Sequence, residues 1–301
     1  MDTREIAVRI GSRECRIRSD DNYLDHIAGT FEPHMVELFR CVAEGSKVIL
    51  DVGANIGCTA ILFGDMAEQV HAFEPSPTTF RYLQENVQAN SVGNVQLHNL
   101  GLGAEAAVTT ITFAPNNRSG GFVSNQTSAN ADHLTEQIEI RTLDQVLDSM
   151  APAAPDFIKI DVEGFEGHVL RGAAATLQRH HPAVVLELNH WCLNAFQRTS
   201  LPDFFDQLRS TFPILCAVDG DRYLDLHSPD ESYEVMYHHI MSMRYQNILC
   251  AFDEDQVARF RTRYHPARQA PAAALPLPTA SDALAARLSR KANTVARRLF
   301  R

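Results

Sequence analysis

The sequence lacks the patterns that stabilise small secreted domains or anchor a chain in a bilayer. Its six cysteines are scattered and form no C-x-x-C pair, which argues against a zinc site or a disulfide framework. No stretch approaches the roughly 18 to 20 apolar residues of a membrane span. The opening Met-Asp-Thr-Arg-Glu has neither the basic start nor the apolar core of a signal peptide. We therefore expect buried thiols, a reducing compartment and a cytoplasmic protein.

Positive charge is scarce outside the C-terminal end. The net charge is −10, but residues 265–301 carry seven Arg or Lys against one Asp, which leaves the rest of the chain at −16. Such an acidic body repels a phosphate backbone. A nucleic-acid substrate is therefore not expected.

The most informative stretch is residues 48–57, Val-Ile-Leu-Asp-Val-Gly-Ala-Asn-Ile-Gly. Its first half is apolar on both faces, as a central parallel strand requires. Gly53 and Gly57 allow a tight turn and a close approach of the backbone to a ligand. A strand, a glycine turn and a helix in this order are the usual seat of a nucleotide-like cofactor.

The details of this turn separate the cofactors. A dinucleotide site would read G-x-G-x-x-G and a P-loop would end in Gly-Lys-Ser/Thr, but here the turn is G-x-x-x-G and Cys58-Thr59 follow it. An acid-led loop suits a cofactor that has a cationic, amino-acid end and no phosphate. The pattern predicts S-adenosylmethionine, and a Rossmann enzyme that uses a nicotinamide cofactor is the weaker alternative.

A second apolar strand, residues 70–74, ends in Glu74. A carboxylate at this point can accept both ribose hydroxyls. An α/β core without any cofactor would explain each segment separately, but the two segments at this spacing favour a cofactor site.

Residues 158–167 contain three carboxylates, Asp161, Glu163 and Glu166, at the point where a strand is followed by a helix. Ligands of open α/β sheets bind outside the carboxyl ends of the strands, so Asp161 and Glu163 are expected to face the same pocket as Gly53. Glu166 is explained equally well as a complement to the helix dipole. Nothing in the spacing of these acids requires a metal, and no metal site is predicted.

The next strand ends in Glu187-Leu188-Asn189-His190 and brings an acid, an amide and an imidazole to the same edge. His190 can accept a hydroxyl proton at neutral pH, or it is a hydrogen-bonded histidine at a strand end. The pairs His180-His181 and His238-His239 lack metal-ligand spacing and are expected on surface turns or helices.

Strands and helices alternate along most of the chain, after a small hairpin expected at residues 4–18. This rhythm predicts an α/β fold with a doubly wound, mostly parallel seven-stranded sheet. The expected strands are 48–52, 70–74, 95–100, 157–161, 183–188, 212–218 and 246–252. The expected helices begin at Pro33 and cover 56–67, 78–89, 166–179, 202–209 and 253–263.

The alternation of strands and helices stops between residues 104 and 142. Val108–Phe113 and Gln137–Arg141 alternate like two antiparallel strands, a β-hairpin insertion that brackets a polar loop. Long polar loops of this kind are usually functional or disordered. We expect Arg118 and Ser119 to donate hydrogen bonds to substrate oxygens, against the alternative of a plain surface loop.

Residues 48–57, the Phe73-Glu74-Pro75 turn and the Lys-Ile-Asp-Val-Glu-Gly run at 159–164 closely resemble the FkbM-type family of S-adenosylmethionine-dependent methyltransferases. The resemblance covers roughly residues 31–252. It implies a Rossmann-like class I methyltransferase fold and methyl transfer to oxygen, on sugars, glycans or polyketide-like natural products. The Asn-Pro-Pro-Tyr signature of amino-group methyltransferases is absent, which also favours oxygen.

The resemblance assigns a role to most of the candidate residues. Asp51, Gly53, Asn55 and Gly57 would line the methionine end of the cofactor, Glu74 would hold the ribose, and Asn99 and Leu100 would border the adenine. Asp161 or Glu163 would take the hydroxyl proton, with His190 behind them and Asn189 at the substrate. A module that binds the cofactor or a sugar without turnover is the alternative from another class.

Four regions are expected along the chain: 1–47, a hairpin and helix packed on the core; 48–264, the cofactor-binding domain; 265–280, a Pro/Ala-rich linker; and 281–301, a basic amphipathic helix. Ser281 can cap that last helix. A basic amphipathic helix on a tether is typical of segments that lie on an anionic membrane or dock on an acidic partner. The sequence specifies neither the acceptor nor the oligomeric state.

Overall fold

The computed structural model describes residues 3–124, 127, 132–150 and 154–267. The chain divides into a compact unit that ends at Pro266 and a second unit from Ala267 to Arg301. All elements below belong to the first unit. The helix expected at 281–301 and all but the first three residues of the expected linker lie outside the described residues, so both stay predictions.

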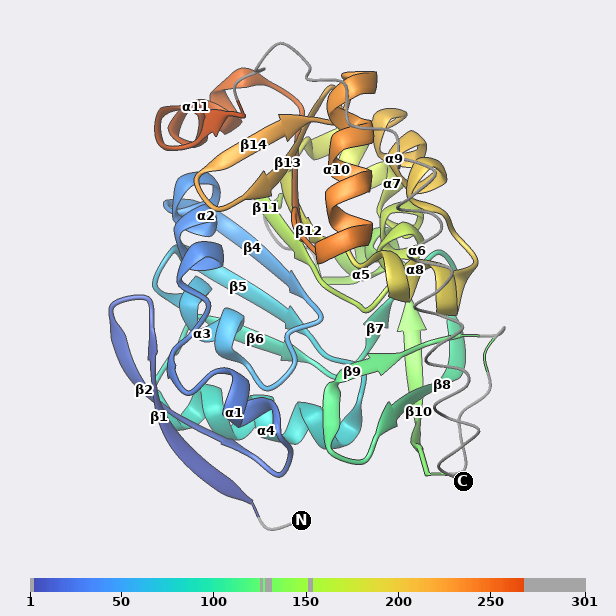
Figure 1. Cartoon of the computed structure of the whole chain (residues 1–301). Helices are drawn as coiled ribbons and strands as arrows, with labels where there is room; N and C mark the ends of the chain where they lie inside the picture. The colour runs from blue at the N-terminus through green and yellow to red at the C-terminus, as the bar shows by residue number, and fades with distance from the viewer. Residues whose placement is uncertain (1–2, 125–126, 128–131, 151–153, 268–301) are drawn as a thin grey trace, which may run out of the picture. The chain divides into compact units, whose positions relative to one another are not determined.

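A nine-stranded sheet forms the centre of the first unit (Figure 1), in the order β6-β5-β4-β11-β12-β15-β13-β14-β16. The strands from β6 to β12 pair in parallel, whereas β15 is antiparallel to both of its neighbours. The strands are β4 (Ser46–Val52), β5 (Ala67–Phe73), β6 (Val95–His98), β11 (Phe157–Ile160), β12 (Ala183–Glu187), β13 (Ile214–Asp219), β14 (Arg222–Asp225), β15 (Asn247–Ala251) and β16 (His265–Pro266). All seven expected strands are present, which confirms the predicted fold class, and β14 and β16 extend one edge beyond the prediction.

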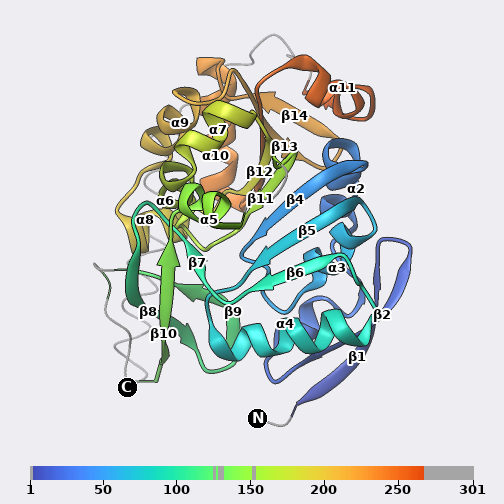
Figure 2. The same cartoon turned by 180° about the vertical axis from the view of Figure 1, so that it is seen from behind.

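Helices cover both faces of this sheet. Figure 1 shows α2 and α3 in front of it, and Figure 2, from behind, shows α5, α6 and α7. The helices are α1 (Tyr23–His26), α2 (Pro33–Ala43), α3 (Cys58–Gly64), α4 (Pro77–Ala89), α5 (Leu143–Met150), α6 (Glu166–Gly172), α7 (Ala174–His180), α8 (His190–Gln197), α9 (Leu201–Arg209), α10 (Pro229–Ser242) and α11 (Glu254–Arg263). Because both faces are covered, Val48, Ile49 and Leu50 of β4 are at most 1% exposed.

Some helices differ from the expectation. The helix expected at 166–179 is two helices, α6 and α7, and a Cβ on Gly172 at the break would lie 1.9 Å from the Gly103 carbonyl oxygen. Helices α1, α5, α8 and α10 were not predicted, although Ser228 caps α10 and Pro229 opens it, which is a recognisable start signal. The expectation that both residues of the His238-His239 pair lie at the surface is wrong for His239, which is fully buried.

The expected N-terminal hairpin is present as β1 (Arg4–Ile10) and β2 (Arg13–Ser19), with β3 (Gly29–Thr30) beside β1. It packs on α4, where the Asn86 side chain accepts from the Arg18 N–H at 2.8 Å and donates to the Arg18 carbonyl. The same amide donates to the carbonyl of Ile56 in the glycine turn at 2.8 Å. One buried side chain thus joins the hairpin to the turn.

The insertion forms a second sheet in the order β7-β10-β8-β9. The expected antiparallel pair is confirmed as β8 (Ala107–Ala114) and β10 (Leu134–Arg141), and β7 (Gly101–Leu102) joins its edge. The polar loop expected between these two strands is wrong in its first part, because Asn117–Phe122 forms strand β9 against β8. This strand is fixed at its end by Phe122, which is buried and stacks on Phe196 at 3.7 Å between ring centroids.

Candidate active site

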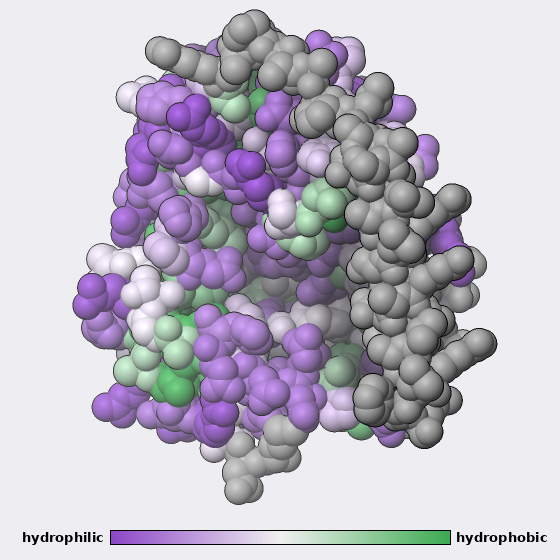
Figure 3. Space-filling view, in the orientation of Figure 1, coloured by the Kyte–Doolittle hydropathy of each residue, from purple (hydrophilic) through white to green (hydrophobic). Residues whose placement is uncertain are grey.

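Three cavities meet at the edge of the sheet where β4, β5 and β11 end. The Glu74 cavity, of about 720 Å³, lies between this edge and the inserted sheet. The Tyr23 cavity, of about 310 Å³, lies between the glycine turn and residues 23–35. The Glu187 cavity, of about 700 Å³, lies between the ends of β11 and β12 and the start of α2. Figure 3 shows this face of the molecule hollowed near its centre.

Gly53 brings two strand ends into contact. Its φ is +80°, and a Cβ there would lie 1.8 Å from the carbonyl oxygen of Asp161. Gly57 also has a positive φ, of +103°, but its neighbour is Leu83 of α4 and it lines none of the three cavities. The turn therefore needs glycine at 53 for the approach of β11, and at 57 for helix packing.

Glu74 is a buried carboxylate with its oxygens held by the backbone. Oε2 accepts from the Asn55 N–H at 3.1 Å and Oε1 from the Ser76 N–H at 2.9 Å. Asn55 reaches this position with a left-handed φ of +50°. Burial raises the pKa of Glu74 to about 7. Each oxygen keeps a second lone pair, and the side chain lines the cavity, so two hydroxyls of a ligand can be met side by side.

Asp51 lies behind the turn and lines none of the three cavities. It is fully buried; its Oδ2 accepts from the Thr59 hydroxyl at 2.6 Å, and its Oδ1 lies 3.4 Å from the Lys159 ammonium. Lys159 in turn donates to the Gly53 carbonyl at 2.7 Å. Asp51 thus holds the shape of the turn through its partners.

The end of β6 supports the Glu74 turn from below. The Asn99 side chain donates to the carbonyls of Glu74 and Pro75, at 2.9 and 3.1 Å. Neither Asn99 nor Leu100 lines the Glu74 cavity, but Leu102, two residues further on, does. Position 102 is a wall of the cavity, while position 99 fixes the carboxylate's backbone.

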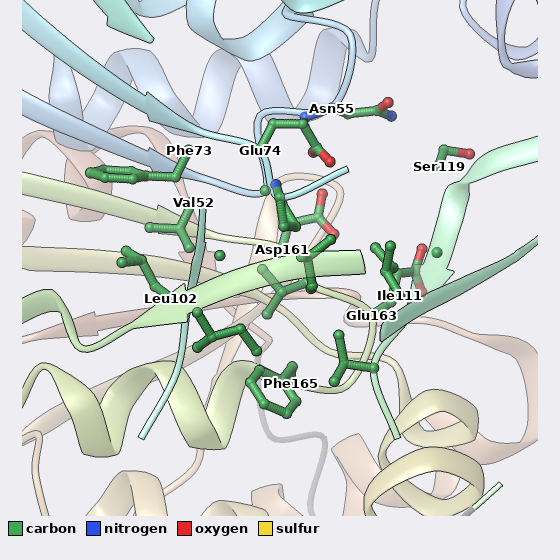
Figure 4. A pocket seen from close by; sticks show the side chains of 18 of the residues that line it. Val52, Asn55, Phe73, Glu74, Leu102, Ile111, Ser119, Asp161, Glu163 and Phe165 are labelled. Atoms are coloured by element: carbon green, nitrogen blue, oxygen red, sulfur yellow. The ribbon is translucent and has the colours of Figure 1, made fainter. Parts of the chain in front are cut away.

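The inserted sheet supplies an apolar wall that the sequence reading missed. Ile111, Ile138 and Ile140 line the Glu74 cavity from β8 and β10, and Phe165 lines it from the turn after β11. Figure 4 shows Leu102 and Phe165 on the opposite side of the cavity from the Glu74 carboxylate. The signal was the alternation within the two strands, which marks one inward apolar face but not what that face covers.

Arg118 and Ser119 both line the Glu74 cavity, on the side of the inserted sheet. The Arg118 guanidinium is only 12% exposed and lies 3.1 Å from Asp20 and 3.7 Å from Glu136. Glu136 accepts from the hydroxyls of Ser76 and Thr78, which follow the Glu74 turn. Arg118 therefore ties β9 to the N-terminal segment and to the start of α4.

Asp161 is the residue that all three cavities share. Its carboxylate is 40% exposed and lies 3.4 Å from the ammonium of Lys159, which is nearly buried. Lys159 is a buried residue of the candidate site to which the sequence reading gave no role of its own. The signal was available, because a lysine inside a buried strand needs anionic partners, and here they are Asp51 and Asp161.

Glu163 lines the Glu74 cavity and accepts from the Cys192 thiol at 3.1 Å. Its φ of +53° is left-handed, a strained conformation that is concentrated at functional sites. Burial, and then the charge of Asp161, raise the pKa of Glu163 to about 7. Glu166 fits its structural interpretation, because one of its oxygens accepts from the N–H groups of Val162 and Gly164.

Glu187 and Glu32 form an acidic cavity wall that the sequence reading did not assign. Both line the Glu187 cavity together with Asp161, Gln246 and Asn247. The Oε2 atom of Glu187 is buried and has no hydrogen-bond partner among the described residues. Burial, and then the charges of neighbouring carboxylates led by Asp161, hold the pKa of Glu187 well above its usual range.

Asn189 and His190 lie apart from the three cavities. Asn189 caps α8 by accepting from the Cys192 N–H at 3.2 Å. The His190 ring meets His239 edge to face at 5.0 Å, and burial lowers the pKa of His190. Neither residue lines a cavity, so of the three proposed bases Asp161 and Glu163 are the two that face one.

Within the part of the chain that the structure describes, no group of three or more His, Cys, Asp or Glu side chains has the arrangement of a metal site. In the same part, no helix is both long and apolar enough to cross a membrane.

The strand order, the reversed strand β15 and the glycine turn beside an acid at the end of β5 define a class I methyltransferase fold. The profile of the family described as the methyltransferase FkbM domain matches residues 51–222. The chain belongs to this family, as the motifs at 48–57 and 159–164 suggested.

Two curated relatives and one solved structure show the range of similarity. Methyltransferase 1 of Beauveria bassiana is 32% identical over 142 residues, which cover 41% of this chain and 57% of the relative. Hexuronic acid methyltransferase AglP of Haloferax volcanii is 33% identical over 152 residues, 49% of this chain and 58% of the relative. The chain thus spans less than two thirds of either. A methyltransferase FkbM from Methylobacillus flagellatus KT has a TM-score of 0.42 at 20% identity, over 68% of this chain and 43% of that one.

Proposed function

We propose that the protein binds S-adenosylmethionine and transfers its methyl group to a hydroxyl of a sugar, glycan or natural-product acceptor. The observation that carries the proposal is the position of Asp161, a carboxylate shared by all three cavities. A carboxylate that lines both a cofactor cavity and an acceptor cavity can take the hydroxyl proton at the place where the methyl group is transferred.

The Glu74 cavity suits the nucleoside part of the cofactor. Glu74 offers two preoriented oxygens to the ribose hydroxyls, and Leu102, Ile140 and Phe165 offer apolar surface to the adenine. The carboxylate and the apolar walls fit the group that the family implies.

The Tyr23 cavity suits the amino-acid end of the cofactor. Its lining includes Gly53, Ala54 and Asn55 of the glycine turn, and Tyr23 and Phe31 of the N-terminal segment. It shares Gly53, Asn55 and Asp161 with the Glu74 cavity, so one extended molecule can occupy both.

Asp161 is proposed as the base. When bound, the cofactor supplies a methyl group on a sulfonium, which is already an activated leaving group. The chain has to align the acceptor oxygen and take its proton as the O–CH₃ bond forms. Lys159, fixed by Asp51, orients the Asp161 carboxylate from 3.4 Å. The proton of the hydroxyl passes to that carboxylate.

A sugar-type acceptor is supported by the name of the Haloferax relative, a hexuronic acid methyltransferase, and by the oxygen-rich lining of the Glu187 cavity. Transfer to oxygen is supported by the carboxylate base and by the absence of Asn-Pro-Pro-Tyr from the sequence. The insertion strand that carries Arg118 and Ser119 faces the cofactor side, and we propose that these residues close that cavity over its ligand.

Labelled cofactor incubated with the protein and a panel of hydroxylated glycans tests the proposal. Transfer of label that Asp161→Asn abolishes supports an O-methyltransferase. Tight cofactor binding with no transfer across a broad panel would instead identify a binding module.

The basic segment 281–301 is proposed to contact an anionic membrane surface. Co-sedimentation with anionic vesicles should fall when the chain ends at Ala267, while methyl transfer is unchanged, since no proposed site residue lies beyond that point. Equal partitioning of the two proteins would contradict the membrane contact and leave an acidic partner as the remaining proposal.

A further inference from the structure

The Glu187 cavity has a charge pattern unlike that of the Glu74 cavity. Three of its lining residues are acidic, Glu32, Asp161 and Glu187, and Lys159 is the one cation among the described residues that line it. Lys159 is already paired with Asp51 and Asp161 at 3.4 Å. Among the described residues that line it, the cavity therefore has more acids than cations and offers no free cation to a ligand.

The carboxyl group of Glu187 favours a ligand that donates hydrogen bonds. Oε2 is shielded from water and has no hydrogen-bond partner among the described residues, although the side chain lines a cavity of about 700 Å³. The protein thus leaves this carboxyl group short of hydrogen-bond partners, and a ligand in the cavity that supplies one to the side chain is stabilised. A hydroxyl or an ammonium group can do so, whereas a carboxylate, sulfate or phosphate would be buried there without a cation.

The amide groups of Gln246 and Asn247 line the same cavity and can both donate and accept hydrogen bonds. Apolar surface comes from Met35, Phe39 and Val185. Amides and carboxylates beside an apolar face match the hydroxyls and the C–H face of a sugar ring. The match does not extend to a ring that carries an acid group into the cavity.

Resting on the proposed function, we infer that the Glu187 cavity receives the methyl acceptor and selects an uncharged or amino-bearing polyhydroxylated ring over a carboxylate-bearing one. Glu187, at the buried end, and Glu32, at the exposed start of α2, are the residues that determine this selectivity. The hydroxyl to be methylated lies toward Asp161, which joins this cavity to the two assigned to the cofactor.

The test compares three matched ligands on the full chain: the methyl glycosides of glucose, glucosamine and glucuronic acid. Binding is measured by ligand-observed NMR, with and without S-adenosylhomocysteine, and methyl transfer is measured separately. We expect glucosamine and glucose glycosides to bind at least about tenfold more tightly than the glucuronide, because burying its carboxylate in a cavity without a free cation is strongly unfavourable.

Two variants and a control locate the effect. Glu187→Gln should weaken the glucosamine glycoside severalfold, while Glu32→Lys should bring the glucuronide to within about threefold of the glucose glycoside. Glu105→Gln removes an exposed acid that lines none of the three cavities and should change nothing. Retained binding of S-adenosylhomocysteine shows that each variant is folded.

The outcomes separate this inference from the proposed function. The expected ranking without any methyl transfer supports the selectivity and contradicts the transferase. Methyl transfer to the glucuronide as efficient as to the glucose glycoside overturns the selectivity and leaves the transferase intact. Absence of any detectable binding by the glucose and glucosamine glycosides also overturns the inference.

Discussion

The two halves of the site use carboxylates in opposite ways. At the end of β5, Glu74 has each oxygen bound to a backbone N–H, and the Asn99 amide holds its carbonyl from behind. At the ends of β11 and β12, Asp161 is 40% exposed and one oxygen of Glu187 has no hydrogen-bond partner among the described residues. In the first half the carboxylate is held by the backbone before any ligand binds. In the second half a carboxylate oxygen has no hydrogen-bond partner among the described residues.

This contrast follows from what each half is proposed to do. Ribose hydroxyls are the same in every turnover, so a carboxylate fixed by the backbone lowers the ordering cost of binding. A base has to change its protonation state during each turnover, so its oxygens cannot all be committed to fixed donors. In the roles proposed here, the acid that binds the ribose has a backbone donor on each oxygen, and the acid that takes the proton has none among the described residues.

The largest effect is expected in the second half, for Asp161→Asn. The amide keeps the shape but cannot accept the hydroxyl proton, so kcat should fall about 10² to 10⁴-fold. Cofactor affinity, which we assign mainly to the Glu74 half, should change less than about tenfold. Methyl-transfer kinetics and calorimetry measure the two quantities, and Asp148→Asn, an exposed acid on α5, is the matched control. Full activity in Asp161→Asn would remove the base from this position.

Gly53→Ala should disturb both halves together. The new Cβ would overlap the Asp161 carbonyl oxygen, at 1.8 Å, in a backbone conformation that alanine rarely adopts. We expect a loss of roughly 3 kcal/mol or more in the free energy of unfolding, and loss of cofactor binding. Gly93→Ala, where a Cβ meets nothing within 4 Å, is the control and should be nearly neutral. Chemical denaturation of both variants tells them apart, and equal stability would contradict the close contact.

Glu74→Gln should affect the first half alone. One ribose hydroxyl loses a charged acceptor, so cofactor affinity should fall about tenfold, or about 1.4 kcal/mol. The wild-type affinity should rise with pH up to about 7, because the pKa of Glu74 is about 7 and the ionised form is the better acceptor. The variant should lack that rise. Calorimetry from pH 5.5 to 8.5 checks both, with Glu68→Gln, an exposed acid on the same strand, as control.

Glu166, buried behind the second half, should show its effect in stability. Burial raises its pKa from 4.5 to about 7, so the folded state keeps a proton that the unfolded state releases between these values. The contribution of Glu166 to the free energy of unfolding is full at pH below 4.5. It is lost as the pH rises through 7, by at most about 1.4 kcal/mol per pH unit. Glu166→Gln should flatten that part of the stability curve. An unchanged slope from pH 5 to 7 would contradict the raised pKa.

The sequence predicted the first half of the site better than the second. The glycine turn and Glu74 belong to one contiguous strand–turn–helix–strand unit, so local spacing was enough to place them. Even in this unit the prediction was only partly right about which residues face a ligand. Gly53 and Asn55 line a cavity, while Asp51 and Gly57 do not. The side of the turn that a residue faces depends on α4 and β11, which the local pattern does not contain.

The second half depends on contacts between distant segments. Glu32 and Glu187 share a cavity although they are far apart in the sequence, and only the docking of α2 beside β12 brings them together. His190 looked like a base because it follows a strand end, but α8 begins at this residue, and its ring lies on His239. Helix α8, which was not predicted, therefore places this candidate base away from the site.

The bonds of Asn86 impose an order in time. The N-terminal hairpin is synthesised first, but the side chain that fastens it to the glycine turn comes 68 residues after Arg18. At the usual rate of chain synthesis this interval is roughly 3 to 14 seconds, before the delay of the ribosomal tunnel. During that time the hairpin can pack against α1 and α3 but not against α4, so its attachment to the glycine turn through Asn86 forms after those contacts.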